Sequence, residues 1–200
     1  KLRLNLSKTQ EIVFKRPGPG SRMLNLPSPL ENIERVDSVK LLGCVLTDGL
    51  TGAKHVDFIL NIVNQRLYLL NYFKAHGMNI HGLTLVFDAI VVSRIMYAMQ
   101  AVSFLVNQTD IVRINAVFKK AHRWGLTTKL LRLGDLATQA DTKLFRALKN
   151  KDHCLHQLLP DKRTNYSLNL RKRGHDYCLP ELQTELHKSS FINRCLFKFV

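Results

Sequence analysis

Four basic side chains are spaced so that they could bind the phosphates of a nucleic acid. They lie in a stretch with helical periodicity that begins at capping residues after Asn107 and ends at Gly125. Positions three and seven apart share one face of a helix, so the spacing predicts a basic face opposite the apolar one. Arg113, Lys120 and Arg123 share this face, and Lys119 is adjacent to it. Such a row follows phosphates without reading bases, although a merely solvated face has the same pattern.

The charge balance of the whole chain points to a polyanion as partner. Of 200 residues, 30 are Lys or Arg and 15 are Asp or Glu, which gives a net charge of +15 and a pI of about 10.0. An excess of this size favours nucleic acid, ahead of an anionic membrane. The second half is the more basic. Its tail holds charges that fit either a flexible basic arm or a plain solvated loop, namely Lys162, Arg163, Arg171, Lys172 and Arg173.

Cysteines and histidines near the C-terminus give a weaker signal for metal chemistry. One residue separates Cys154 from His156, and two separate His175 from Cys178. This spacing departs from that of common structural zinc sites, so ordinary side chains are favoured over zinc ligands. The cysteines form no CxxC pair. A reducing compartment, nuclear or cytoplasmic and not secretory, is the expectation.

The N-terminal part predicts short strands around a loop. Apolar residues alternate with polar ones over residues 2–6 and resume over 12–14, which indicates two strands around a turn. Four of the 6 prolines fall within 15–30, so we expect a loop there. An apolar run over 39–46 predicts a buried strand, in which Gly43 marks a bulge or the close approach of another backbone.

The remainder predicts helices, over residues 54–75, 83–105, 107–125, 134–150 and 191–200. Residues 83–106 are apolar enough to suggest a membrane span, but Asp88, Arg94 and Gln100 would be costly in lipid. We therefore predict a buried helix and no membrane partner. The fold class is α+β: short N-terminal strands, then a mainly helical part and a basic, loosely ordered tail, with divisions at 1–52, 53–150 and 151–200.

Several of these residues resemble motifs of a known enzyme family. The sequence Val-Lys-Leu-Leu-Gly at 39–43, followed by Lys54, His55 and Val56, is similar to the primer-grip region of reverse transcriptases of non-LTR (LINE-type, jockey-like) retrotransposons. Residues 2–9 resemble the preceding palm motif, in which a leucine-asparagine pair precedes a lysine-threonine pair. The sequence Arg-Ile-Met-Tyr-Ala at 94–98 and the stretch 113–126 resemble the thumb and post-thumb parts of the same polyproteins.

The resemblance implies roles for particular residues. The strands would be the end of the palm, and residues 53–150 would be the thumb and post-thumb. Leu41, Leu42 and Gly43 would present backbone to the primer end. Lys8 would protonate the departing pyrophosphate, as a general acid. The partners would be the RNA and DNA of a primer-template, held mainly by their phosphates, and the remainder of the parent polyprotein.

The resemblance also bears on activity. Nucleotidyl transfer with two metal ions needs carboxylates placed together, and this chain has no Asp-Asp pair. In the family these aspartates lie just upstream of the Lys8 motif. We therefore expect a C-terminal fragment that holds no cofactor and cannot polymerise alone, whereas the complete parent enzyme would use a divalent metal, magnesium. Two alternatives stay open: a non-enzymatic helical nucleic-acid-binding protein derived from such an element, and a decayed fragment without function.

Overall fold

The chain folds into two compact units, each built mainly of helices. The computed structural model describes residues 5–15, 26–163 and 174–198. Unit 1 comprises residues 1–95 and 105–129, and unit 2 comprises 96–104 and 130–200. Small two-stranded sheets accompany the helices in unit 1, so the fold class is α+β, as the sequence predicts. The units are not continuous stretches of chain, whereas the predicted divisions at 52 and 150 are.

The N-terminal segment of unit 1 differs from the predicted pair of strands. Leu6–Lys8 forms a short 3-10 turn, η1, in which the side chain of Asn5 accepts a hydrogen bond from the N–H of Ser7. The polar residues Gln10–Glu11 form strand β1 instead of the apolar residues 12–14, and β1 pairs in parallel with β2, Glu34–Arg35. Asn5 outweighs the alternating pattern because its side chain offers the backbone a local partner.

The apolar run over 39–46 forms a hairpin, not the single buried strand that the sequence predicts. Strands β3, Ser38–Leu41, and β4, Cys44–Thr47, pair antiparallel, with Leu41 opposite Cys44. Leu42 and Gly43 make the turn with φ values of 46° and 82°. Positive φ at both central residues is the geometry of a type I′ turn, whose twist matches that of the flanking strands. Gly43 therefore supplies a turn, whereas the sequence predicted either a bulge or the close approach of another backbone.

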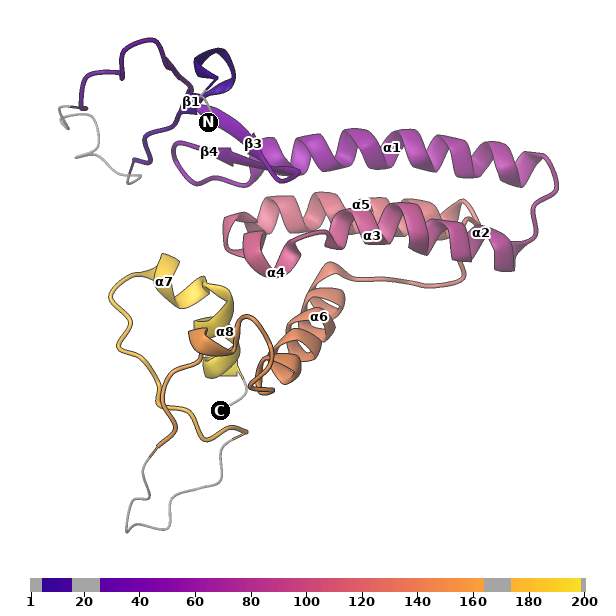
Figure 1. Ribbon diagram of the computed structural model, residues 1–200. Helices are drawn as coiled ribbons and strands as arrows, with labels where there is room; N and C mark the ends of the chain where they lie inside the picture. Colours follow the sequence, from indigo (N-terminus) through magenta and orange to yellow (C-terminus); the bar gives the residue numbers. More distant parts are fainter. Residues whose placement is uncertain (1–4, 16–25, 164–173, 199–200) are drawn as a thin grey trace. The chain divides into compact units, whose positions relative to one another are not determined.

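Helices pack around one apolar core in unit 1. Helix α1, Ala53–Ala75, lies beside the nearly continuous run of α2, Ile80–Phe87, the π-helical segment η3, Asp88–Val92, and α3, Ser93–Met96, and it also packs on α5, Gln108–Arg123 (Figure 1). The predicted spacing of α1 is confirmed. The fully buried side chains at the centre of this core include Val63, Leu70, Phe87, Val91, Ile95, Ile114 and Leu126.

Local signals in the sequence place both ends of α5. The side chain of Asn107 accepts a hydrogen bond from the N–H of Asp110, which satisfies one of the free amides of the first turn. At the other end Gly125 adopts a φ of 65°, and the N–H of Leu126 donates to the carbonyl of Ala121. This is the glycine termination that the sequence predicts.

The predicted helix over 83–105 is interrupted. Ala98 has a φ of 54° and precedes α4, Met99–Val102, which leads into the 3-10 turn η4, Ser103–Leu105. Residues 80–105 have the length and composition of a membrane span, but only 28% of the most apolar 18-residue stretch within them is buried, so the segment is one-sided and not buried all round. Core helices of soluble proteins have the same length and composition, so the absence of a membrane partner stays a prediction.

Unit 2 has its own core, to which the tail contributes. Its helical elements in the described part of the chain, besides α4 and the first two residues of η4, are α6, Leu133–Leu148, η5, His156–Leu158, α7, Glu185–Ser189, and α8, Phe191–Lys198. Phe145 of α6 packs with Tyr177, Cys195 and Leu196. The described part of the tail is therefore ordered by an apolar cluster, contrary to the expected loose arrangement. The buried residues are too far apart in sequence to make a periodic pattern.

Candidate nucleic-acid interface

The predicted primer-grip residues lie at the exposed tip of the β3–β4 hairpin. Leu41 is 56% exposed and Leu42 is 83% exposed, so this apolar tip contributes little to the core. A leucine with positive φ is strained, because its Cβ approaches the carbonyl oxygen. An apolar side chain held in a strained and exposed position suggests a contact with something other than this unit.

Two cations flank an aromatic ring beside this hairpin. The Nζ of Lys40, on β3, lies 4.4 Å from the centroid of the Phe58 ring, and the guanidinium carbon of Arg94 lies 5.2 Å from it. Phe58 is on the second turn of α1, so strand, helix and ring are held together. The positive charges are thereby kept close to the hairpin in fixed positions. Lys40 and Arg94 occur within the motifs that resemble the family, but neither was predicted to be a site residue.

His55 joins the hairpin to α1. Its Nδ1 accepts a hydrogen bond of 3.2 Å from the backbone N–H of Val45, and only 2% of the residue is exposed. The Nε2 atom is buried and has no hydrogen-bond partner in the described part of the chain. Burial lowers the pKa of His55, and the charge of Arg94 lowers it further. The imidazole is therefore neutral near pH 7, with its proton on Nε2.

The structure separates the four predicted cations of α5. Arg113 lies against α1, where its guanidinium forms ion pairs with Asp57 and, one turn away on its own helix, with Asp110. The hydrogen bond to Asp57 is the main reason that the pKa of Arg113 is raised. A phosphate would have to displace two carboxylates to reach this guanidinium. Arg113 therefore has a structural role that the helical spacing did not predict.

The other three cations of α5 are available to a phosphate. Lys119 and Arg123 are exposed, and neither forms an ion pair with any carboxylate in the described part of the chain. Lys120 is half-buried, and its Nζ lies 4.4 Å from the centroid of the Trp124 ring. A cation over an aromatic face keeps its charge, so all three still attract anions. They also lie in the last turns of α5, where cations stabilise the helix dipole.

Acidic residues are rare around these cations. Between residues 58 and 134 the sequence holds only Asp88 and Asp110 as acids. Asp88 pairs with Lys129 and Asp110 with Arg113, so both are already neutralised. In contrast, the β strands and the loop around them carry most of the carboxylates of unit 1, including Glu11, Asp37 and Asp48. The C-terminal halves of α1 and α5 therefore form a surface of unit 1 with excess positive charge.

The remaining predicted site residues are not brought together with these helices. Lys8 ends the η1 turn and is exposed. Lys162 is exposed and forms a bridge with Tyr177 in unit 2, where Arg163 donates to the carbonyl of Tyr177 at 3.2 Å. The side chain of Arg163 thus stabilises unit 2 through this hydrogen bond. The predicted sites at 171–173 lie outside the described residues.

The four residues considered as zinc ligands have other roles or lie apart. The ring of His175 is buried, with Nε2 2.8 Å from the carbonyl oxygen of Leu196 and Nδ1 accepting from the N–H of Tyr177. The Nδ1 of His156 lies 2.7 Å from the carbonyl oxygen of Leu148. Cys154 and Cys178 are exposed. No group of three His, Cys, Asp or Glu residues is gathered in the parts of the chain that the structure describes.

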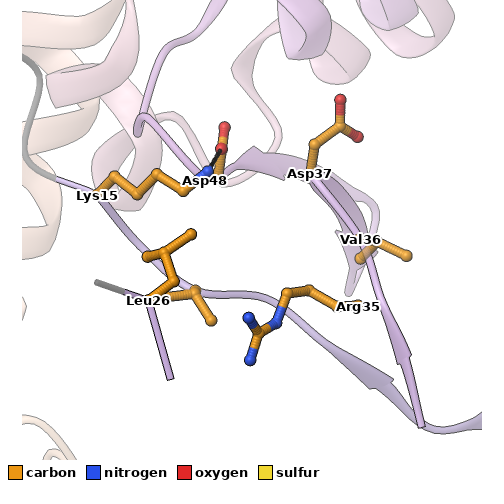
Figure 2. A pocket seen from close by; sticks show the side chains of 7 residues that line it. Lys15, Leu26, Arg35, Val36, Asp37 and Asp48 are labelled. Atoms are coloured by element: carbon orange, nitrogen blue, oxygen red, sulfur yellow. Dashed lines mark hydrogen bonds and ion pairs between the residues drawn. The ribbon is translucent and has the colours of Figure 1, made fainter. Parts of the chain in front are cut away.

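Two shallow cavities of unit 1 show no built site. One, of about 180 Å³, lies beside the first strands, and Figure 2 shows the ion pair of Lys15 with Asp48 on one side of it and Arg35 on the other. The guanidinium of Arg35 is already held by the carboxylate of Glu11 in two hydrogen bonds of 3.0 Å. The second, of about 390 Å³, is lined by the paired Asp88 and Lys129. In both, the charged groups are already engaged.

Comparison with known proteins adds no relative. No protein-family model, no curated protein and no solved structure matches this chain. The hairpin tip and the cations of α5 are therefore interpreted from their own geometry and from the motifs in the sequence.

Proposed function

We propose that this chain is the primer-template-binding part of an RNA-directed DNA polymerase of the non-LTR retrotransposon type. One observation carries the proposal: Lys119, Lys120 and Arg123 of α5 form no ion pairs with described carboxylates, in a region where the few acids are already neutralised. Such a surface attracts phosphates, and it does so without a preference for base sequence. The similarity of the sequence motifs to those reverse transcriptases supports the choice of an RNA–DNA duplex as ligand.

The hairpin supplies the second part of the proposed interface. Leu41 and Leu42 are held away from the core at a strained turn, and Lys40 is fixed beside them over Phe58. Backbone and apolar side chains at such a tip can pack against a sugar, while the adjacent cation meets a phosphate. The interface would thus combine a rigid hairpin, which positions the primer end, with helical cations, which supply salt-dependent affinity. The role of Lys8 as a general acid belongs to the same proposal and concerns the complete enzyme.

The test is the salt dependence of binding to a labelled RNA–DNA hybrid. We expect binding with little sequence preference and with an affinity that falls steeply as salt rises, because counterions are released from the neutralised phosphates. A variant with Lys119→Gln, Lys120→Gln and Arg123→Gln should bind more weakly. Its plot of log K against log salt should be flatter by about 0.9 for each phosphate that the variant no longer neutralises.

Two matched variants control for net charge and for the paired arginine. Lys143→Gln with Arg146→Gln and Lys151→Gln removes three exposed cations of unit 2, the same loss of charge as in the α5 triple variant, and should leave the salt slope unchanged. Arg113→Gln should also leave it unchanged, because that guanidinium is occupied by Asp57 and Asp110. Equal slopes in the α5 triple variant and in the wild type, or no binding by the wild type, would overturn the proposal.

A further inference from the structure

Helix α1 carries an exposed aromatic stripe that the core does not use. Tyr68, Tyr72 and His76 follow one another at intervals of four residues, so they lie on one line along the surface of the helix. Tyr68 is 75% exposed and Tyr72 is 53% exposed. The apolar face of α1, through Val63, Leu67 and Leu70, is on the other side. Large aromatic side chains in a regular exposed row point to a ligand with flat faces.

The spacing of the two tyrosines along the helix is close to the thickness of one flat ring stacked between two others. Residues four apart on a helix are separated by about 6 Å along its axis. A base sandwiched between two rings needs about 7 Å, twice the spacing of about 3.4 Å between stacked bases. Both side chains lean the same way along the helix. The spacing of Tyr68 and Tyr72 along the helix is therefore close to what one unpaired base needs.

The ring of Tyr72 is already supported on one side. The His76 ring lies 4.0 Å from it, centroid to centroid, at an interplanar angle of 34°, and His76 Nδ1 is 2.9 Å from the carbonyl oxygen of Tyr72. His76 follows Tyr72 by one turn, so it lies on the opposite side of Tyr72 from Tyr68 along the helix. The described residues make no ring contact with Tyr68. The part of the stripe that is left open to a ligand is thus the space between Tyr68 and Tyr72.

The surroundings of the stripe suit a nucleic-acid strand. No acidic residue occurs from 58 to 87, so nothing on this helix beyond Asp57 repels a phosphate. The one arginine of that interval, Arg66, is turned away and donates to the carbonyl of Ile90. Asn64 and Gln65 are exposed one turn before Tyr68 and offer uncharged donors and acceptors to a base edge. Such amides can bind the edge of any base, so little sequence preference results.

From this spacing, support and charge we propose that Tyr68 and Tyr72 form a clamp for one unpaired base of single-stranded nucleic acid. The inference rests on the proposed function and extends it, because duplex phosphates bound at α5 would be joined by an unpaired stretch bound on α1. Bases in a duplex are covered by their neighbours, so the clamp distinguishes single strands from duplexes. Stacking on aromatic side chains contributes strongly to affinity for single strands and depends little on sequence.

The test compares single-stranded and duplex oligonucleotides, the single strand carrying one 2-aminopurine whose fluorescence reports stacking. For Tyr68→Leu and for Tyr72→Leu we expect an affinity for the single strand that is about 5- to 100-fold lower, with less quenching. Tyr68→Phe and Tyr72→Phe should bind as the wild type does, since the ring is kept. Affinity for the RNA–DNA hybrid should be unchanged in all four variants.

Leu85→Ala is the matched control, because it removes an exposed apolar side chain from a different helix of unit 1, α2. It should have no effect on either ligand. Four outcomes would overturn the clamp: Leu variants that bind single strands normally, Phe variants as weak as Leu variants, an equal loss for hybrid, or wild-type dimers that the Leu variants dissociate. If one of these outcomes occurs while hybrid binding and its salt slope are as proposed, only the clamp is refuted. If the wild type binds no nucleic acid, both proposals are refuted.

Discussion

The backbone N–H of Val45 donates a hydrogen bond of 3.2 Å to Nδ1 of His55, and this contact joins the hairpin to the first turn of α1. The acceptor must be unprotonated, so the bond exists only while the imidazole is neutral. Val45 lies two residues after Gly43, so the position of the hairpin tip depends on the protonation of one buried side chain. Acidification should therefore affect the hairpin before it affects the helices.

The first prediction concerns the pH dependence of stability. The pKa of His55 in the folded chain is below the ordinary value of 6.5, through burial first and the charge of Arg94 second. Just below that value the unfolded chain therefore binds more protons than the folded one, and the free energy of unfolding falls as pH falls. As pH falls, this loss of stability begins near the pKa of His55 in the unfolded chain and is complete once the pH has passed below its pKa in the folded chain. Denaturant unfolding followed by the fluorescence of Trp124, from about pH 8 to about pH 5, measures it.

A His55→Asn variant isolates this contribution from the other histidines. The asparagine oxygen can accept from Val45, but the amide does not titrate. The variant should lose part of the pH dependence while it keeps most of its stability near pH 8. If the variant and the wild type show the same slope of stability against pH, His55 is not the titrating group.

A second prediction concerns the strained turn at Leu42. Asparagine tolerates positive φ, and Asn-Gly is the favoured pair in type I′ turns. Leu42→Asn should therefore raise the stability of unit 1 by about 1 kcal/mol, as measured by denaturant unfolding. If the exposed leucine contacts nucleic acid as proposed, the same variant should bind the RNA–DNA hybrid more weakly. A gain in stability with unchanged binding would show that the tip is not part of the interface.

Local patterns in the sequence predicted the helices well, and there are physical reasons for the elements that they did not predict. The apolar spacing of α1 and the Asn107 and Gly125 signals of α5 act within a few residues, so the sequence displays them directly. The hairpin was missed because Leu42 is a poor residue for a left-handed turn and Gly43 is equally consistent with a bulge. The core of unit 2 joins Phe145 to Cys195, which no local pattern connects.

The sequence pointed to the residues that make up the candidate interface, but only partly to their arrangement in space. The helical spacing located the cations of α5, but the carboxylate of Asp57 that occupies Arg113 comes from another helix, and sequence periodicity contains no information about such pairs. For Tyr68 and Tyr72, their spacing of four in a stretch without acids was a signal in the sequence. Its meaning depended on knowing which face of α1 is buried.

A third prediction uses the four cysteines as probes of burial. Cys44 and Cys195 are buried, whereas Cys154 and Cys178 are exposed. Burial raises the pKa of both buried thiols, that of Cys195 to about 12 with a further contribution from Asp141. Because the thiolate is the reactive form, a thiol reagent near neutral pH should modify the two exposed cysteines of the folded chain quickly. All four should react in strong denaturant. Rapid reaction of Cys195 in the folded chain would contradict the buried cluster of unit 2.

The last prediction concerns the close approach of Gly52 to Leu105. A Cβ atom added to Gly52 would lie 2.4 Å from the carbonyl oxygen of Leu105 and 2.8 Å from its carbonyl carbon. The φ of Gly52 is −83° and its ψ is −13°, which any residue adopts, so the conflict is steric and not conformational. Both obstructing atoms belong to the backbone, so no rotamer change can relieve them. Gly52→Ala should destabilise unit 1 by about 1–3 kcal/mol.

The matched control for Gly52 is Gly49→Ala in the turn that precedes it. The added Cβ of that variant would meet only the Cγ2 of Thr51, at 3.8 Å, which is an ordinary contact. Its stability should stay within about 0.5 kcal/mol of the wild type. Both variants can be followed by denaturant unfolding through Trp124, which belongs to unit 1. Gly52 directly precedes α1, and Leu105 lies shortly before α5. Equal stabilities for the two variants would therefore mean that the starts of these helices do not approach each other as closely as the structure has them.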